Sequence, residues 1–205
     1  MLDNVFYINL DHRVDRRKHV EDQLASLGWT KYTRLPAVRC KDGRVGCSMS
    51  HLKLLKMAKQ RDLDYIVILE DDITFTKPDL YNQMLSQFLE MGLEYDVLLL
   101  AGNIRPPLHY VKKFVRRVEK SYTTTGYVVR KHYYDTLIDN IKSGIRRLLA
   151  SPHSHGQNAI DTHWFPLQKR DTWLIFSPRT VTQLADYSDI EGRRVDYEHV
   201  MLDKS

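Results

Sequence analysis

The sequence predicts an α/β fold, with strands and helices alternating along the first half and a more irregular second half. Apolar runs of strand length are followed in turn by amphipathic helical segments. Two of the apolar runs, 64–69 and 95–102, lack polar alternation, which is typical of strands buried on both faces of an α/β sheet. The sequence has no internal repeat of about 20 to 50 residues and no low-complexity tract. A single globular domain is therefore expected.

Each element of the first half has a local signal. Val20, Leu24 and Leu27 lie on one helical face, and Gly28 follows as a stop signal. Ser48 is a candidate cap for the second helix. We expect strands at 4–10, 32–38, 64–69 and 95–102, and helices at 15–28, 48–60 and 77–92.

The second half is harder to assign. The apolar residues between 111 and 118 fit a helix, but residues 114–129 also fit strands around a bend at Gly126, and we favour strands. We further expect a helix at 131–144, a polar loop at 150–160, and short strands between 164 and 178 that are broken by Pro166 and Pro178.

Composition narrows the class of protein. The chain has 205 residues, is 42% hydrophobic and has no run of about 18 apolar residues that could span a membrane. Its N-terminus lacks the pattern of a signal peptide, so a cytoplasmic place is expected, with peripheral membrane association left open. Cys40 and Cys47 are too few for a disulfide framework, although one bridge between them stays possible. The net charge of +5 favours anionic partners, but no nucleic-acid-binding motif accompanies the basic clusters.

Three adjacent acids, Glu70, Asp71 and Asp72, follow the strand expected at 64–69. In extended geometry Glu70 and Asp72 point to one face and Asp71 to the other. Like charges about 4 Å apart repel by on the order of 4 kcal/mol at a dielectric near 20, so a positive group is expected beside them. A divalent cation completed by phosphate and water would fit. Ion pairs with nearby arginines or lysines, or a cap on the next helix, fit the sequence equally well.

Polar groups also follow the first expected strand and open the second expected helix. The first group is Asn9 and Asp11 followed by Arg13, Arg16 and Arg17, and the second is Gly46, Ser50 and His51. A guanidinium at a helix start suits an anion, and a glycine permits close backbone approach. Ligands of α/β proteins bind where the carboxyl ends of strands leave a crevice, so we expect these groups to meet the three acids there.

The sequence resembles glycosyltransferase family 25 over about residues 4–190. The blocks that carry the resemblance, in order, are YINLDHRVDRR, GCSMSHLKLLKMA, VILEDDITF, TTGYVVRKHYYDTLI, IDTHW and SPRTVTQLADYSDI. That family includes bacterial lipooligosaccharide galactosyltransferases and collagen hydroxylysine galactosyltransferases. The resemblance implies a GT-A fold with a Rossmann-like mixed sheet. It also implies inverting transfer of galactose or glucose from a UDP-sugar to a hydroxyl of a glycan or of collagen-like hydroxylysine, with Mn²⁺ or Mg²⁺ as cofactor.

The resemblance further implies an organisation and a set of site residues. Residues 1–102 would bind the nucleotide sugar, and 103–205 would form the acceptor side, with loops such as 103–125 and 150–160 recognising the acceptor. Asp72 is the expected metal contact, with Glu70 beside it. The expected donor-binding residues are Asn9, Leu10, Asp11, Arg13, Gly46, Ser50, His51, Glu70, Asp71, Ser188 and Asp189.

Asp161 is the expected general base, because inversion requires a group that removes the proton of the acceptor hydroxyl. A helix cap or a loop salt bridge is the alternative role for Asp161. In an extended segment His163 would face the same way as Asp161, so His163 is either a third metal ligand or a core histidine. Ser188 and Asp189 would either close over the nucleotide or form an exposed turn.

Two other functions are compatible with the sequence. One is a catalytically inactive relative that binds a UDP-sugar or serves as a scaffold, although the acids at 70–72 and 161 are all present. The other is a nuclease-like or nucleic-acid-binding protein that uses the acids for two metals and the basic clusters for phosphates.

Overall fold

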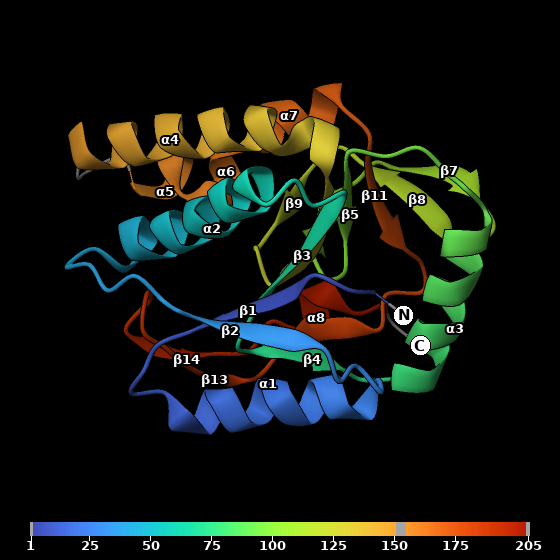
Figure 1. Cartoon of the computed structure of the whole chain (residues 1–205), viewed down its shortest axis with the longest axis horizontal. Coiled ribbons are helices and arrows are strands. Elements are labelled where there is room, and N and C mark those ends of the chain that lie inside the picture. The colour runs from blue at the N-terminus through green and yellow to red at the C-terminus, as the bar shows by residue number, and fades with distance from the viewer. Residues whose placement is uncertain (1, 151–154, 204–205) are drawn as a thin grey trace.

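The computed structural model describes residues 2–150 and 155–203, and its centre is a mixed sheet of eight strands with helices on both faces (Figure 1). The strand order is β2-β1-β3-β10-β5-β11-β8-β7. These strands are β1 (Val5–Asn9), β2 (Tyr32–Pro36), β3 (Tyr65–Glu70), β5 (Val97–Leu99), β7 (Leu108–Lys112), β8 (Val115–Val118), β10 (Gly126–Arg130) and β11 (Trp173–Phe176). The expected α/β fold, with a mixed sheet flanked by helices, is confirmed.

Parallel pairing positions the carboxyl ends of three strands together. β1 pairs in parallel with β2 and with β3, so these strands end near one another at Asn9, Pro36 and Glu70. On its other side β3 pairs antiparallel with β10, so the expectation of parallel neighbours holds for one edge of β3 only. β5 and β11 are parallel, and β8 and β7 complete the sheet in antiparallel pairs.

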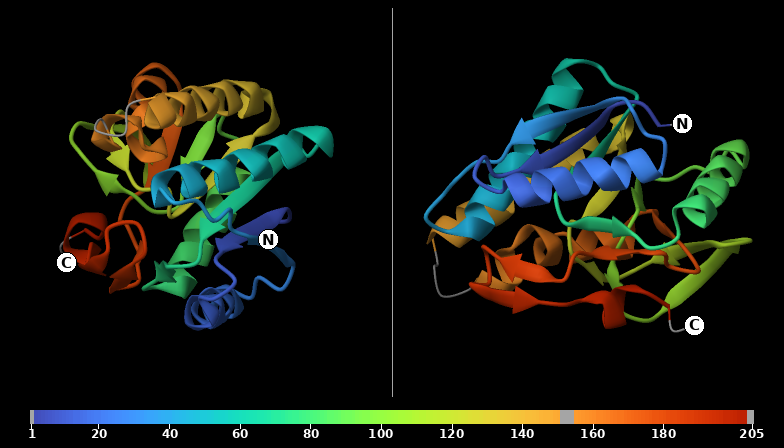
Figure 2. Two further views of the ribbon diagram at one scale, coloured as in Figure 1. Left: turned by 90° about the vertical axis from the view of Figure 1, so that its left-hand side faces the viewer. Right: turned by 90° about the horizontal axis from the view of Figure 1, so that it is seen from below.

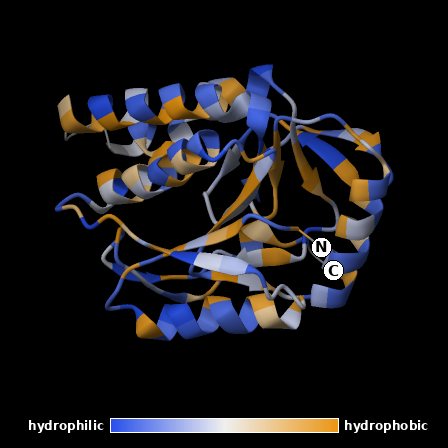
Figure 3. Ribbon diagram, viewed as in Figure 1, coloured by the Kyte–Doolittle hydropathy of each residue, from blue (hydrophilic) through white to orange (hydrophobic). Residues whose placement is uncertain are grey.

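The sheet separates two apolar cores. Alternate residues of β1 face opposite sides, with Val5 and Tyr7 in one core and Phe6 and Ile8 in the other. The first core is covered by α1 (Val14–Ser26), α3 (Pro78–Glu90) and α8 (Glu198–Met201). The second is covered by α2 (Gly43–Gln60), α4 (Tyr134–Ala150), α6 (Ile160–His163) and α7 (Phe165–Arg170). Figure 2 shows α1 on one side of the sheet and α2 and α4 on the other, and Figure 3 shows that the central strands are hydrophobic while α1 is mostly hydrophilic.

Three small antiparallel pairs lie beside the main sheet. They are β4 (Ile73–Phe75) with β12 (Val181–Gln183), β13 (Asp186–Ser188) with β14 (Arg193–Val195), and β6 (Asn103–Ile104) with β9 (Ser121–Tyr122). Because β4 directly follows the three acids, its pairing with β12 brings the C-terminal part of the chain back beside them. The remaining helical turns are η1 (Lys131–Tyr133) and α5 (His155–Asn158).

Two elements differ from the expectation. α2 begins at Gly43, because Asp42 caps it by accepting a hydrogen bond from Arg44 N, and Ser48 lies inside the helix. Residues 165–170 form the helix α7 instead of a strand, because Pro166 occupies its first turn, where a missing N–H costs nothing.

The other expected elements of the second half can also be compared with the structure. The strands favoured within 114–129 are confirmed, and so is the helix at 131–144, which extends to Ala150. Of the polar loop expected at 150–160, residues 151–154 lie outside the described residues. Within residues 2–150 and 155–203, no helix is long and apolar enough to cross a bilayer.

Gly46 is predicted to be required for packing at the start of α2. A Cβ at this position would lie 2.5 Å from the carbonyl oxygen of Val38 and 3.3 Å from Cys40 N, so backbone would have to move. We expect Gly46→Ala to lower the free energy of unfolding by about 1–3 kcal/mol in urea denaturation. Gly156→Ala is the control, because no atom lies within 4 Å of its added Cβ. Equal stability of the two variants would contradict this role.

Candidate active site

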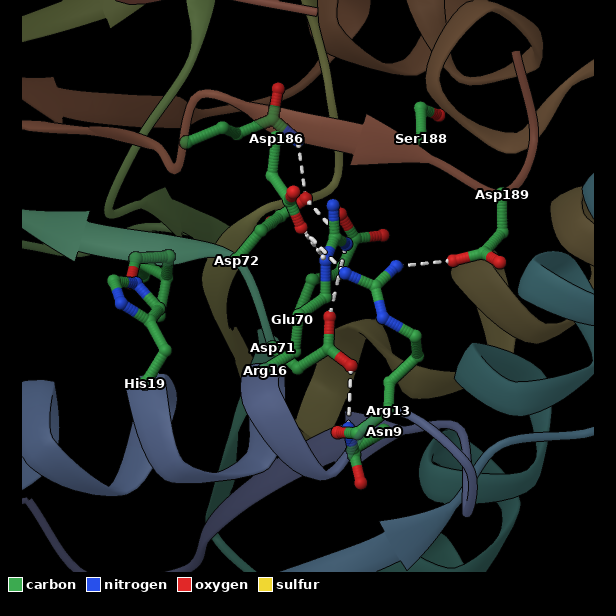
Figure 4. Close-up of polar contacts among 12 residues, drawn as sticks. Asn9, Arg13, Arg16, His19, Glu70, Asp71, Asp72, Asp186, Ser188 and Asp189 are labelled. Carbon is green, nitrogen blue, oxygen red and sulfur yellow. Dashed lines mark hydrogen bonds and ion pairs between the residues drawn. The ribbon is translucent and has the colours of Figure 1, made fainter. Parts of the chain in front are cut away.

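A cleft of about 840 Å³ opens where β1 and β3 end. Most of the residues expected to form the site line it, namely Asn9, Leu10, Arg13, Ser50, His51, Glu70, Asp71, Asp72, Asp161, Ser188 and Asp189. Asp11, Gly46 and His163 are not among the lining residues. In Figure 4 the acids of the β3–β4 turn lie between α1 and the C-terminal strand β13, although these segments are far apart in the sequence.

The three acids point in two directions. Glu70 ends β3, and its Oε1 accepts hydrogen bonds from Thr124 Oγ1 at 2.6 Å and from His51 Nε2 at 3.2 Å. Asp71 and Asp72 belong to the turn before β4 and lie near Arg16 of α1. The expectation that Glu70 and Asp72 share a face is therefore wrong, because the extended geometry ends at Glu70.

Arg16 is the positive group that meets the acids. Its Nη1 lies 3.2 Å from Asp71 Oδ1 and 3.3 Å from Asp72 Oδ2, and its Nε lies 3.2 Å from Asp186 Oδ2 on β13. Its side chain is only 10% exposed, and its Nη2 also donates to the carbonyl oxygen of Tyr187. The ion-pair alternative that the sequence left open is thus present in the structure (Figure 4).

The single positive charge of Arg16 does not neutralise three carboxylates, and the pKa values of the three acids are shifted accordingly. Burial and the charge of Glu70 raise the pKa of Asp72 to about 7, although Arg16 opposes them. Burial also raises the pKa of Asp71, against the hydrogen bond that Asn9 donates. For Glu70, burial acts upward, but the hydrogen bond and charge of His51 outweigh it and lower the pKa. Glu70 is therefore the most readily ionised of the three acids.

Asp72 retains an oxygen that suits a hard cation. Its Oδ1 is buried and has no hydrogen-bond partner among the described residues, while Oδ2 lies near Arg16 and Gln183. An orphaned carboxylate oxygen with incompletely neutralised charge around it fits Mn²⁺ or Mg²⁺. Residues of this turn thus fit the cation that the resemblance implies, with Asp72 as the best-placed ligand.

The ligand set of Asp72, Glu70 and His163 is not brought together. Residues 160–163 form the helix α6, so Asp161 and His163, two positions apart, lie on different sides. His163 lines a separate cavity of about 360 Å³ with Asn140 and Arg147, and burial lowers its pKa. The one set of three potential ligand side chains that meets within the described residues is Cys47, His51 and Glu70, whose donor atoms lie within 4.8 Å of one another.

The loop after β1 is organised by Asn9. Its side-chain amide donates to Asp71 Oδ2 at 2.7 Å and to the carbonyl oxygen of Arg13, and its Oδ1 accepts from Arg34 Nε at 2.9 Å. Asn9 is 1% exposed, so it holds the acidic turn against the loop. Asp11 instead pairs with Arg34 at 2.6 Å at the surface.

Ser50 and His51 support the cleft from α2. Ser50 Oγ donates to the carbonyl oxygen of Gly46 and accepts from Val38 N, which fixes the segment before the helix. His51 is buried between Glu70 and Tyr127, whose hydroxyl lies 2.8 Å from its Nδ1. The contact of Gly46 is with protein backbone at Val38, so its small size serves packing.

Asp161 lies in the first turn of α6 and lines the cleft. Its Oδ2 accepts a hydrogen bond from Thr123 N at 3.2 Å. Burial raises its pKa, and the charge of Glu70 acts in the same direction. The charge of Glu70 at the end of β3 therefore acts on Asp161 as well as on Asp72.

Arg13 ties the loop after β1 to the C-terminal strand. Its guanidinium lies 2.6 Å from Asp189 and 2.5 Å from Asp186, and it also pairs with Asp15. Ser188 accepts from Glu191 N, so the segment around 188–191 forms a turn at the cleft wall. Ser188 and Asp189 therefore belong to the expected turn, and this turn borders the cleft.

Sequence reasoning missed several residues of the site. Cys47 and Thr124 line the cleft and Asp186 pairs with Arg16, and none of the three was expected there. Cys47 precedes His51 by four residues, so helical periodicity could have placed it in the site. Nothing local could have placed Asp186, which meets α1 only through the tertiary fold.

Asp72→Asn is predicted to stabilise the metal-free protein at high pH. Because the folded pKa of about 7 lies above the unfolded value near 3.8, the wild type loses stability as pH rises between these values. Asparagine cannot ionise, so at pH 8 the variant is expected to be more stable by on the order of 2 kcal/mol, and the difference should vanish near pH 4. Urea denaturation at both pH values measures it. A variant less stable than wild type at pH 8 would instead make Asp72 a structural ion-pair partner of Arg16.

The structure has distant counterparts among solved proteins. They include a mannose-1-phosphate geranyltransferase from Thermus thermophilus (12% identity, TM-score 0.47, 83% of this chain and 58% of that chain). They also include a glycosyltransferase involved in the glycosylation of the major capsid of PBCV-1 (8% identity, TM-score 0.45, 84% of this chain and 91% of that chain). A third is a UDP-glucose pyrophosphorylase complexed with UDP-glucose (8% identity, TM-score 0.49, 86% of this chain and 90% of that chain). These likenesses are too distant to bear on activity.

Sequence comparison gives the family. A Haemophilus influenzae protein described as "Putative glycosyltransferase" is 45% identical over 40 residues, which is 20% of this chain and 14% of that protein. Residues 39–150, more than half of the chain, match the family described as Glycosyltransferase family 25 (LPS biosynthesis protein). The match contains α2 and the acids at 70–72, whereas Asn9, Arg13 and Asp161 lie outside it. The chain belongs to glycosyltransferase family 25.

Proposed function

We propose that this protein is a metal-dependent, inverting hexosyltransferase that moves galactose or glucose from a UDP-sugar to a hydroxyl acceptor such as a glycan or a hydroxylysine. One observation carries the proposal. The acids of the β3–β4 turn, the basic loop after β1 and the buried carboxylate of Asp161 line a single cleft. Its volume of about 840 Å³ lies within the range of small-molecule sites, roughly 300–1,000 Å³.

The loop after β1 is suited to the donor diphosphate. Arg13 and Arg16, at the start of α1, both line the cleft, so two guanidiniums lie where an anion would bind. Arg13 itself is only 12% exposed and is held by carboxylates. A diphosphate at this position would compete with Asp189 for the guanidinium, in keeping with the cleft-wall position of Asp189.

Asp72 would hold the cation through Oδ1, which has no hydrogen-bond partner in the part of the chain that the structure describes. A divalent ion there supplies positive charge that offsets the charge developing on a departing diphosphate. Arg16 holds Asp71 and Asp72 in place and keeps the local negative charge partly balanced. Glu70 is anchored on the opposite side by His51 and Thr124, so it is a fixed wall of the cleft.

Asp161 is the proposed general base. Burial raises its pKa, which makes the carboxylate a better proton acceptor near neutral pH. The hydrogen bond from Thr123 N fixes the orientation of the carboxylate. The neighbouring wall comes from Asn103, Arg105 and Tyr122, within the loop proposed to recognise the acceptor.

Asp161→Asn is expected to lower sugar transfer by about 10²–10⁴-fold, the usual contribution of general base catalysis, while UDP affinity persists. Steady-state transfer kinetics and calorimetric UDP titration measure the two effects separately. The matched control is Asp22→Asn, which changes an exposed acid of α1 that pairs with Lys18. Loss of UDP affinity in Asp161→Asn would place this residue at the donor site instead.

A donor screen tests the proposed sugar nucleotide without knowledge of the acceptor. UDP-, GDP- and TDP-sugars would be incubated with and without Mn²⁺, and hydrolysis would be followed by release of the nucleoside diphosphate. We expect Mn²⁺-stimulated release from UDP-galactose or UDP-glucose, and its loss in Asp72→Ala. Binding of UDP-sugars with no turnover, by hydrolysis or to any offered acceptor, would indicate a catalytically inactive relative. Unchanged turnover in Asp72→Ala would refute the metal-binding role.

A further inference from the structure

The net positive charge of the protein is concentrated in one segment, residues 105–120, here called the basic hairpin. It contains six basic residues, Arg105, Lys112, Lys113, Arg116, Arg117 and Lys120, and one acid, Glu119, which gives a net +5. The whole chain also has a net charge of +5, with 31 basic and 26 acidic residues. The other 189 residues therefore hold 25 of each kind and are neutral as a set.

The charges of the basic hairpin are mostly unpaired. Glu119 Oε1 lies 3.0 Å from His109 Nε2 and 3.8 Å from Arg117 Nη1, so Glu119 offsets one positive charge of the hairpin. Among the residues that the structure describes, no carboxylate pairs with Lys112, Lys113 or Arg116. A surface of this kind attracts anions, and its field weakens with rising salt.

The same segment exposes apolar side chains. Every residue from 105 to 113 is exposed. Leu108, Tyr110 and Val111 are 39%, 70% and 38% exposed, and they are three of the ten large apolar side chains exposed among the described residues. Tyr110 is stacked under the guanidinium of Arg116 at 5.0 Å, and its hydroxyl accepts from Lys113 N, so it is held in an ordered hairpin tip.

The hairpin occupies a free edge of the molecule. Across the described ranges, 2–150 and 155–203, β7 is the last strand of the main sheet and pairs only with β8, at the upper right of Figure 1. No residue between 108 and 118 lines the cleft described above. Arg105 at the base of the segment also lines the cleft, but the other cations and the exposed apolar side chains have no part in the proposed sugar-transfer site.

We propose that the basic hairpin docks the protein on an anionic lipid bilayer. Basic side chains near such a surface are attracted to its head groups, and tyrosine with neighbouring aliphatic side chains is suited to the interface. Stable peripheral binding takes both a basic and an apolar contribution, and the hairpin provides both on adjacent residues. A nucleic acid would use the cations but would leave Leu108 and Val111 without an apolar partner.

Sedimentation with phosphatidylcholine vesicles, with and without added phosphatidylglycerol, tests this proposal on the full chain. The wild type is expected to bind only the anionic vesicles. Lys112→Gln with Lys113→Asn should weaken binding about 30-fold, since each cation contributes roughly fivefold at an anionic surface. Leu108→Ser with Tyr110→Ser should weaken it further without changing its salt dependence. Circular dichroism checks that each variant is folded.

The matched control removes the same charge elsewhere. Lys53→Gln with Lys56→Gln changes two exposed lysines of α2 and should leave vesicle binding unchanged. An equal loss in this control would show that net charge alone drives binding and would overturn the proposal. Absence of binding to anionic vesicles would overturn it too. Equally tight binding to heparin or DNA, with no effect of the Leu108 and Tyr110 substitutions, would identify a polyanion surface instead.

Discussion

The buried charge of Arg16 constrains the whole site. Its guanidinium joins α1 to the acidic turn through Asp71 and Asp72, and to the C-terminal strand β13 through Asp186. These segments are separated by up to 170 residues in sequence, and removing a buried charge from such a cluster commonly costs about 3–5 kcal/mol. The walls of the cleft are thus joined by electrostatic contacts in addition to the β4–β12 pairing and the first apolar core.

Because Arg16 holds Asp71 and Asp72, the three acids fall into two groups with different partners. Glu70 belongs to a hydrogen-bonded group with His51 and Thr124, which favours its ionised form. Asp72 is left with an orphaned oxygen and a pKa raised to about 7, a state that a bound cation would relieve. A site that is destabilised when empty and ionised is consistent with a binding function, since strained or unsatisfied groups tend to persist where function requires them.

Much of this architecture could be predicted from the sequence, because apolar periodicity reports burial directly. The strands and helices of the first half follow from it, and so does the meeting of the strand ends at one cleft. Helix starts were less predictable: the cap of α2 is Asp42, and Pro166 begins a helix where it was expected to break a strand. The pairing of Arg16 with Asp186 could not be predicted, since no local pattern specifies which distant carboxylate a basic residue will meet. The orientation of Asp72 could not be predicted either, because side chains stop alternating between the two faces where a strand ends in a turn.

UDP binding with and without Mn²⁺ is the most direct measurement of whether the acidic turn serves a cation. Titration calorimetry on the wild type and on Asp72→Asn would give the coupling between the two ligands. If Asp72 holds the ion beside the diphosphate, Mn²⁺ should tighten UDP binding by at least about tenfold in the wild type, or about 1.4 kcal/mol, and not in the variant. Equal UDP affinity in the presence and absence of Mn²⁺ would contradict this and would leave Arg16 as the counter-charge of Asp71 and Asp72.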